Sequence, residues 1–250
     1  MSFQEITAGL PPPKPLRLGD TALFLDLDGT LAPIAARPQD VGPDPRRTGL
    51  LERLTERLDG RLAVVSGRTL DDIDRILEGR VTAVAAVHGL VRRDAQGRVV
   101  ETPAHPGLAA AAEALHAFAA RDSGLIVEEK GLSVALHFRL APRHAEAARA
   151  CAADLAAQTG LVLQEGAMVE ELRTPGPDKG ASVRAFLSER PFIGAMPVFV
   201  GDDATDEAGF AAARAPGGVA VAVGPQQGPT EAGFRLPGVE AALTWLEAAA

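Results

Sequence analysis

The chain has 250 residues with one Cys, one Trp and no Tyr, and it is 46% hydrophobic and 23% charged. This composition is typical of a globular chain with an aliphatic core. A single cysteine excludes an intramolecular disulfide framework and a thiolate zinc cluster, so we expect a reducing compartment. The net charge of −8 gives no basic footprint for nucleic acid or for an anionic membrane. Without a membrane-length apolar run or a signal-peptide pattern in residues 1–20, we expect a cytoplasmic protein with no membrane partner.

Strands and helices are predicted to alternate in the first part of the chain. Residues 23–27 form an apolar run that is typical of a buried parallel strand ending in a loop, and residues 62–65 and 81–87 form two more such runs. Leucines with helical spacing precede the second run, and residues 70–77 predict another helix. This alternation predicts right-handed βαβ units and a parallel sheet with helices on both faces.

The middle of the chain has a different pattern. We expect a helix over about 108–121, strands over 125–128 and 132–138, a second helix over 143–159, and strands over 161–164 and 168–172. Two αββ units in succession predict a small α/β layer inserted into the first domain, with hinges at the prolines near 103–106 and 174–177. We therefore expect a core domain of residues 1–104 and 175–250 and a cap domain of residues 105–174.

The alternating pattern returns after the insert, and polar side chains follow the predicted strands. A helix opens at Lys179, and strands are expected over 197–200 and 219–223. On their own, two aspartates in an Asp-x-Asp pattern are as typical of turns or helix caps as of a site. The loops of an open α/β sheet, however, meet in one crevice at the carboxyl ends of its strands. The groups expected there are Asp26, Asp28, Ser66, Lys179, Asp202, Asp203 and Asp206.

These side chains favour one kind of chemistry. Clustered carboxylates repel one another unless a hard cation bridges them, and Mg²⁺ with oxygen ligands satisfies that need. A lysine, a serine hydroxyl and helix-start amides are groups that bind phosphoryl oxygens. The set therefore predicts metal-assisted phosphoryl transfer, with a carboxylate available as the nucleophile.

Four ordered motifs resemble those of the haloacid dehalogenase superfamily of phosphatases: Asp26-Leu27-Asp28-Gly29-Thr30, Ser66, Lys179 and Gly201-Asp202-Asp203-Ala204-Thr205-Asp206. The resemblance implies a Rossmann-like core, with Asp26 as the nucleophile that becomes an aspartyl phosphate. It implies that Asp28 protonates the leaving oxygen and later deprotonates the attacking water. Ser66, Gly67 and Lys179 would bind the phosphoryl oxygens.

The same resemblance implies a Mg²⁺ site. Its ligands would be the carboxylates of Asp26 and Asp202 and the backbone carbonyl of Asp28, with Asp203 or Asp206 contributing directly or through water.

Further segments are similar to trehalose-6-phosphate phosphatases: Val65-Ser66-Gly67-Arg68, Glu128 to Ser133 continuing to His137-Phe138-Arg139, and Glu171 eight residues before Lys179. The resemblance implies that Glu128, Lys130 and Glu171 bind hydroxyls of the distal glucose, with Arg139 and His88 nearby. It implies that Arg68 supports the phosphate loop. The implied activity is Mg²⁺-dependent hydrolysis of trehalose 6-phosphate, the last step of trehalose biosynthesis, with functional coupling to the synthase that makes the substrate.

Alternatives to these assignments stay open at this point. Residues 128–131 have the composition of a solvated hairpin turn, His88 is equally typical of a structural histidine, and His137 and Arg139 fit an exposed strand face. A related capped phosphatase acting on a sucrose or mannosyl phosphate is the nearest alternative function. A non-catalytic module that binds sugar phosphates is the other, although both motif aspartates of an enzyme are present.

Overall fold

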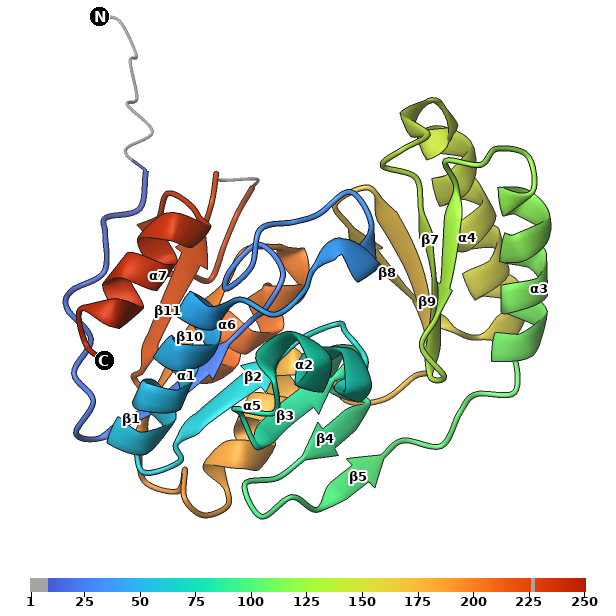
Figure 1. The fold of residues 1–250 in the computed structure, drawn as a ribbon. Helices are drawn as coiled ribbons and strands as arrows, with labels where there is room; N and C mark the ends of the chain where they lie inside the picture. Colours follow the sequence, from blue (N-terminus) through green and yellow to red (C-terminus); the bar gives the residue numbers. More distant parts are fainter. Residues whose placement is uncertain (1–8, 226–227) are drawn as a thin grey trace, which may run out of the picture.

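The computed structural model describes residues 9–225 and 228–250, so residues 1–8 of the segment in which the sequence has no signal-peptide pattern lie outside the described residues. The strands of the described residues form two sheets, one of eight strands in the order β12-β11-β10-β1-β2-β3-β4-β5 and one of four strands in the order β6-β7-β9-β8 (Figure 1). The expected α/β class, with a sheeted core and a separate smaller sheet, is therefore confirmed.

In the larger sheet six strands pair in parallel with one another, and β4 and β5 are joined to them by antiparallel pairing. In spatial order the strands are β12 (Phe234–Leu236), β11 (Val219–Val223), β10 (Met196–Gly201), β1 (Thr21–Leu25), β2 (Leu62–Val65), β3 (Ala83–Ala86), β4 (Val91–Arg93) and β5 (Val99–Glu101). The antiparallel strands β4 and β5 extend the sheet at its edge. The sequence pattern did not predict this hairpin, because β4 carries two arginines and the residues of β5 are exposed.

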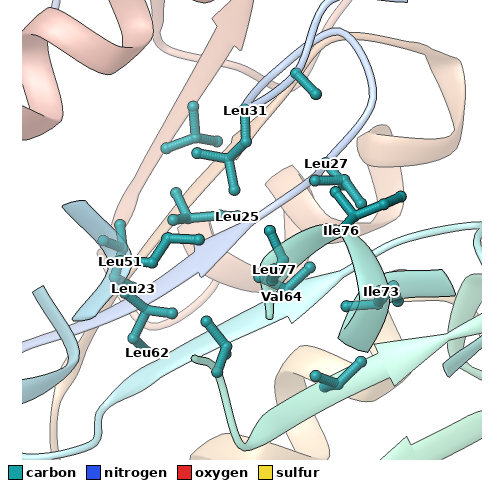
Figure 2. Close-up of a cluster of buried hydrophobic side chains, with 14 of the residues drawn as sticks. Leu23, Leu25, Leu27, Leu31, Leu51, Leu62, Val64, Ile73, Ile76 and Leu77 are labelled. Atoms are coloured by element: carbon teal, nitrogen blue, oxygen red, sulfur yellow. The ribbon is translucent and has the colours of Figure 1, made fainter. Parts of the chain in front are cut away.

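Helices cover both faces of the larger sheet, as the alternation predicted. Leu23 and Leu25 point to the face covered by α1 (Pro45–Arg57), α2 (Leu70–Leu77) and α7 (Val239–Glu247), and Figure 2 shows part of this cluster. Ala22 and Phe24 point to the other face, which packs against α5 (Lys179–Leu187) and α6 (Glu207–Arg214). Among the described residues, none of the helices is long and apolar enough to cross a membrane.

The smaller sheet belongs to two αββ units in succession, as predicted. The first contains α3 (Leu108–Ala119), β6 (Ile126–Glu129) and β7 (Ser133–His137), and the second contains α4 (Ala145–Thr159), β8 (Val162–Gly166) and β9 (Val169–Arg173). We call these elements the cap and the rest of the described chain the core. The side chains of Val134, Leu136 and Leu172 pack against the helices. Figure 1 shows that the opposite face of the sheet is turned toward the core.

Candidate active site

Three strand ends of the core bring the predicted polar groups together. Strand β1 pairs in parallel with both β10 and β2. The strands that follow β1 in the chain, β2 to β5, lie on one side of it in the sheet, and β10 to β12 lie on the other side. This arrangement is a topological switch point, where an open α/β sheet forms its binding crevice. Asp26, Ser66 and Asp202 directly follow β1, β2 and β10, respectively, and all three line a pocket between the core and the cap.

Lys179 reaches this pocket from the start of α5. The side chain of Asp178 caps the helix by accepting a hydrogen bond from the backbone N–H of Ala181 at 2.7 Å, which fixes the position of the first turn. The ammonium group of Lys179 donates to Asp26 Oδ1 at 2.9 Å and to Asp206 Oδ1 at 2.7 Å, and all three side chains are buried. Burial alone would lower the pKa of Lys179, but the charges of Asp206 and Asp26 raise it well above its ordinary value.

Three carboxylates meet beside this lysine. Asp26, Asp202 and Asp206 each offer an oxygen atom, and these atoms lie within 4.8 Å of one another. Burial and the charges of Asp206 and Asp203 raise the pKa of Asp202 to about 8. Burial also raises the pKa of Asp26 well above its ordinary value; Lys179 opposes this shift, and Asp206 and Asp202 add to it. One lysine therefore does not compensate the negative charge, and a cation bound here would relieve the repulsion.

Gly29 permits the close approach on which the carboxylate cluster depends. Its φ is +85°, and a Cβ atom added there would collide with the carboxylate of Asp202. A side chain at this position would be strained by the backbone conformation and would displace one of the three oxygen donors. All three side-chain donors are carboxylate oxygens, which is the ligand type that Mg²⁺ prefers.

The predicted metal ligands divide into two groups in the structure. Asp26, Asp202 and Asp206 form the cluster, whereas the carboxylate of Asp203 accepts hydrogen bonds from the backbone N–H of Thr205 at 2.8 Å and from its hydroxyl at 2.6 Å. Asp206 Oδ2 in turn accepts from the backbone N–H groups of Asp202 and Asp203. Asp203 thus shapes the turn that carries its neighbours, and a contact between Asp203 and the metal stays a prediction.

The predicted acid and base, Asp28, lies beside the cluster rather than in it. Its two carboxylate oxygens accept hydrogen bonds from Nε and Nη2 of Arg68, both at 2.7 Å. Its side chain is 32% exposed, whereas that of Arg68 is 8% exposed. A molecule in the pocket can therefore reach Asp28, while Arg68 holds the Asp28 carboxylate in place.

The cap supplies a second polar cluster, centred on Glu171. The carboxylate of Glu171 accepts hydrogen bonds from Lys130 Nζ at 2.8 Å and from the hydroxyl of Ser133 at 2.5 Å, and it lies 3.4 Å from His88 Nε2 of the core. Burial would raise the pKa of Glu171, but Lys130 and His88 outweigh it and hold this pKa well below its ordinary value. Glu171 is therefore ionised at neutral pH.

The register of the cap sheet explains how two glutamates share the pocket. Glu128 of β6 and Glu171 of β9 are both the cross-strand partners of Ala135 on the intervening strand β7. Because the three residues are in register on neighbouring strands, the side chains of Glu128 and Glu171 lie on the same face of the cap sheet. Glu128 also accepts a hydrogen bond from His137 Nε2 at 2.8 Å, so His137, which fitted an exposed strand face, lies in the pocket.

The cap touches the core at the loop that follows β2. Lys130 Nζ donates a hydrogen bond to the backbone carbonyl of Gly67 at 3.0 Å. A Cβ atom on Gly67 would collide with the His88 ring, so the glycine makes room for the histidine that approaches Glu171. His88 itself lies in a strained left-handed conformation with a φ of 57°, a state that persists where the surroundings hold it in place.

The predicted site residues line this pocket with the exception of Asp206, which is fully buried and contacts the pocket residue Lys179. Arg139 is among the lining residues, and its Nη2 donates to the carbonyl of Ala167 at 2.6 Å. Sequence reasoning missed the loop of residues 34–38, which also lines the pocket. This loop has no periodic pattern, and its only signal was its position after the Asp28 motif. Among the described residues that line the pocket, none is Phe, Tyr or Trp, so hydrogen bonds rather than stacking on such a ring would have to recognise a ligand.

Comparison with known proteins identifies the family. The trehalose-phosphatase family model matches residues 24–240. The chain is 40% identical to the trehalose-6-phosphate phosphatase of Escherichia coli K12, and it is 38% identical to a probable trehalose-phosphate phosphatase of Sinorhizobium fredii. Each match covers 90% of this chain and 85% of the relative.

Solved structures agree with this result. A trehalose-6-phosphate phosphatase related protein is 30% identical with a TM-score of 0.75, and the match covers 90% of this chain and 95% of that one. The C-terminal domain of the Candida albicans trehalose-6-phosphate phosphatase, at 21% identity and a TM-score of 0.84, shares the fold, and the match covers 96% of this chain and 97% of that one. With its motif residues gathered in one pocket and a family model that spans nearly all of the described residues, the chain belongs to the trehalose-phosphatase family.

Proposed function

We propose that this chain is a Mg²⁺-dependent phosphatase that hydrolyses trehalose 6-phosphate to trehalose and phosphate. One observation carries the proposal: a single pocket joins the Lys179 and carboxylate cluster of the core to the Glu128, Lys130 and Glu171 cluster of the cap. The first cluster fits a phosphoryl group and the second fits sugar hydroxyls. The names of the relatives, two of which are trehalose-phosphate phosphatases, support this substrate.

Asp26 is the proposed nucleophile. One of its carboxylate oxygens forms a bond to phosphorus while the bond between phosphorus and the sugar oxygen breaks, and the electron pair of that bond goes to the sugar oxygen. Asp28 gives its proton to this oxygen, so that trehalose leaves as a neutral alcohol. Ser66 and Lys179 bind the phosphoryl oxygens, and Lys179 already contacts the Asp26 carboxylate at 2.9 Å.

Hydrolysis of the aspartyl phosphate restores the protein. The oxygen of a water molecule bonds to phosphorus, the bond between phosphorus and Asp26 breaks, and the Asp26 carboxylate is regenerated. The ionised Asp28 accepts the proton that the water loses, so it returns to the state in which it began the cycle. Inorganic phosphate is the second product. Asp28 is suited to both steps because it lies next to the cluster and is partly exposed to the pocket.

The carboxylates of Asp26, Asp202 and Asp206 would hold Mg²⁺, together with the backbone carbonyl of Asp28. Their donor atoms and separations fit a hard cation. When bound, Mg²⁺ supplies positive charge that stabilises the phosphoryl oxygens as charge develops on them. The raised pKa values of Asp26 and Asp202 are a sign of the charge that this cation would compensate.

The cap is the proposed selector of the sugar. We propose a core domain of residues 1–104 and 175–250 and a cap domain of residues 105–174, with the substrate bridging the two. Lys130 and the two glutamates would exchange their present contacts for hydrogen bonds to glucose hydroxyls, with Arg139 and His88 nearby. Closure of the cap on the substrate would exclude bulk water from the phosphoryl site. A synthase that forms trehalose 6-phosphate would be the functional partner.

Lys130→Ala tests the role of the cap in this function. We expect the variant to lose about 10- to 100-fold in kcat/KM on trehalose 6-phosphate, because a charged hydrogen bond to the sugar disappears. The loss on p-nitrophenyl phosphate, which has no glucose hydroxyls, should be much smaller. Arg143→Ala serves as the control, because Arg143 is exposed and pairs with Asp122 elsewhere on the cap. Equal losses on both substrates would show that Lys130 does not select the sugar.

A further inference from the structure

Three consecutive residues of the loop after β2 contact three different parts of the pocket. Ser66 is a proposed phosphate ligand, Gly67 accepts the hydrogen bond from Lys130 of the cap, and Arg68 binds both carboxylate oxygens of Asp28. The third contact is not explained by binding of phosphate or of sugar. The guanidinium group of Arg68 contacts the side chain that is proposed to exchange protons, namely Asp28.

The guanidinium group of Arg68 is fixed independently of Asp28. Its Nη1 donates to the backbone carbonyl of Pro38 at 2.6 Å, and the backbone N–H of Arg68 lies 3.3 Å from the Ser66 hydroxyl. The side chain of Arg68 is 8% exposed, compared with 32% for Asp28. The buried arginine is therefore held in place by the backbone, and the more exposed carboxylate of Asp28 takes its orientation from the arginine.

Fork-to-fork pairing restricts Asp28 more than a single hydrogen bond would. Two parallel N–H···O bonds of 2.7 Å define the plane of the carboxylate as well as its position. Each carboxylate oxygen has about two lone-pair sites, so each retains one that faces away from Arg68. The pairing thus leaves Asp28 able to exchange a proton with a group in the pocket.

We propose that Arg68 is a positioning residue that holds the Asp28 carboxylate in the orientation needed for proton transfer. This inference rests on the proposed function, in which Asp28 serves as acid in the first step and as base in the second. Arg68 does not touch the substrate or the reacting atoms in this account. Its whole effect on the rate passes through Asp28.

The leaving group of the substrate separates this role from a general structural one. A sugar oxygen needs a proton to leave, whereas p-nitrophenolate leaves readily without one. In Arg68→Ala, the first turnover of trehalose 6-phosphate should therefore slow by about 10- to 100-fold, while the first release of p-nitrophenol stays within about threefold of the wild-type rate. Because water activation still depends on Asp28, the variant should show a burst of p-nitrophenol followed by a slow steady state.

Asp28→Asn provides the reference in the same rapid-mixing measurement. It should show the same dependence on the leaving group, and the double variant Asp28→Asn with Arg68→Ala should be no slower than Asp28→Asn alone. Arg68→Lys keeps the charge but loses the fork, so it should show the same pattern with a smaller loss. Arg93→Ala is the matched control, because Arg93 makes an equivalent bidentate pair with Asp74 at 2.6 and 2.7 Å, outside the pocket.

The outcomes distinguish failure of the inference from failure of the proposed function. If Asp28→Asn shows no dependence on the leaving group, the proposed acid and base role of Asp28 is wrong. If Asp28→Asn shows it but Arg68→Ala slows both substrates equally without a burst, Arg68 only supports the loop and the inference is overturned. A faster Arg68→Ala variant, or additive losses in the double variant, would also overturn it.

Discussion

Asp26→Asn should abolish turnover of trehalose 6-phosphate, with a loss of about 10⁴-fold or more, because the amide cannot form the aspartyl phosphate. The folded state should persist. Asn has nearly the same shape, and burial raises the pKa of Asp26 well above its ordinary value, so replacing this carboxylate with a neutral amide removes a buried charge. The contact between Lys179 and Asp206 at 2.7 Å should survive the substitution.

The measurement is phosphate release at saturating Mg²⁺, together with the thermal unfolding midpoint of each protein. Asp71→Asn is the matched control, because Asp71 is an exposed residue of α2 and its substitution leaves the pocket unchanged. A fully folded Asp26→Asn variant that still released phosphate at an appreciable fraction of the wild-type rate would rule out the covalent mechanism.

Lys179→Met should reduce both activity and stability. The substitution leaves two buried carboxylates, Asp26 and Asp206, without their shared cation, and breaking a buried ion pair in this way costs about 3–5 kcal/mol. The pKa values of both carboxylates are already raised by burial in the presence of Lys179, and they should rise further without it. Loss of a phosphate ligand next to the nucleophile should lower kcat by about 10²- to 10³-fold.

The stability loss of Lys179→Met should depend on pH in a defined direction. A carboxyl group with a raised pKa in the folded state stabilises the protein at low pH, and this contribution is lost as the pH rises through the folded-state pKa. The difference in unfolding free energy between wild type and variant should therefore be larger at pH 8 than at pH 5. Urea unfolding without added metal measures it, and Lys14→Met, at an exposed lysine, is the control. A difference that shrinks with rising pH would contradict the charge argument.

The sequence predicted the parts of the fold that depend on local pattern. Buried parallel strands are nearly uninterrupted apolar runs, so β1, β2 and β10 were recognisable from their residues, and the polar groups after them marked the crevice. The β4–β5 hairpin was missed because Arg92 and Arg93 pair with Glu189 and Asp74. Residues that are distant in sequence therefore stabilise this edge of the sheet, and these pairs cannot be predicted from a short segment of sequence.

The pairings within the site could not be predicted in the same way. That Asp28 binds Arg68, or that His88 lies against Glu171 of the cap, depends on how loops distant in sequence approach one another. The resemblance to a family named the residues, but it did not indicate that the cap lysine Lys130 contacts Gly67 of the phosphate loop. The register of the cap sheet, with Ala135 between two glutamates, is likewise a property of the folded chain.

The most direct test of the account is the initial rate of phosphate release from trehalose 6-phosphate, sucrose 6-phosphate, a mannosyl phosphate and glucose 6-phosphate, measured with Mg²⁺ and with EDTA. We expect kcat/KM to be highest for trehalose 6-phosphate by about 100-fold or more, since a site built around buried polar groups discriminates strongly between ligands that pair with them and ligands that do not. EDTA should remove this activity, and excess Mg²⁺ should restore it. Equal rates across the panel, or activity that is insensitive to EDTA, would contradict the proposed function.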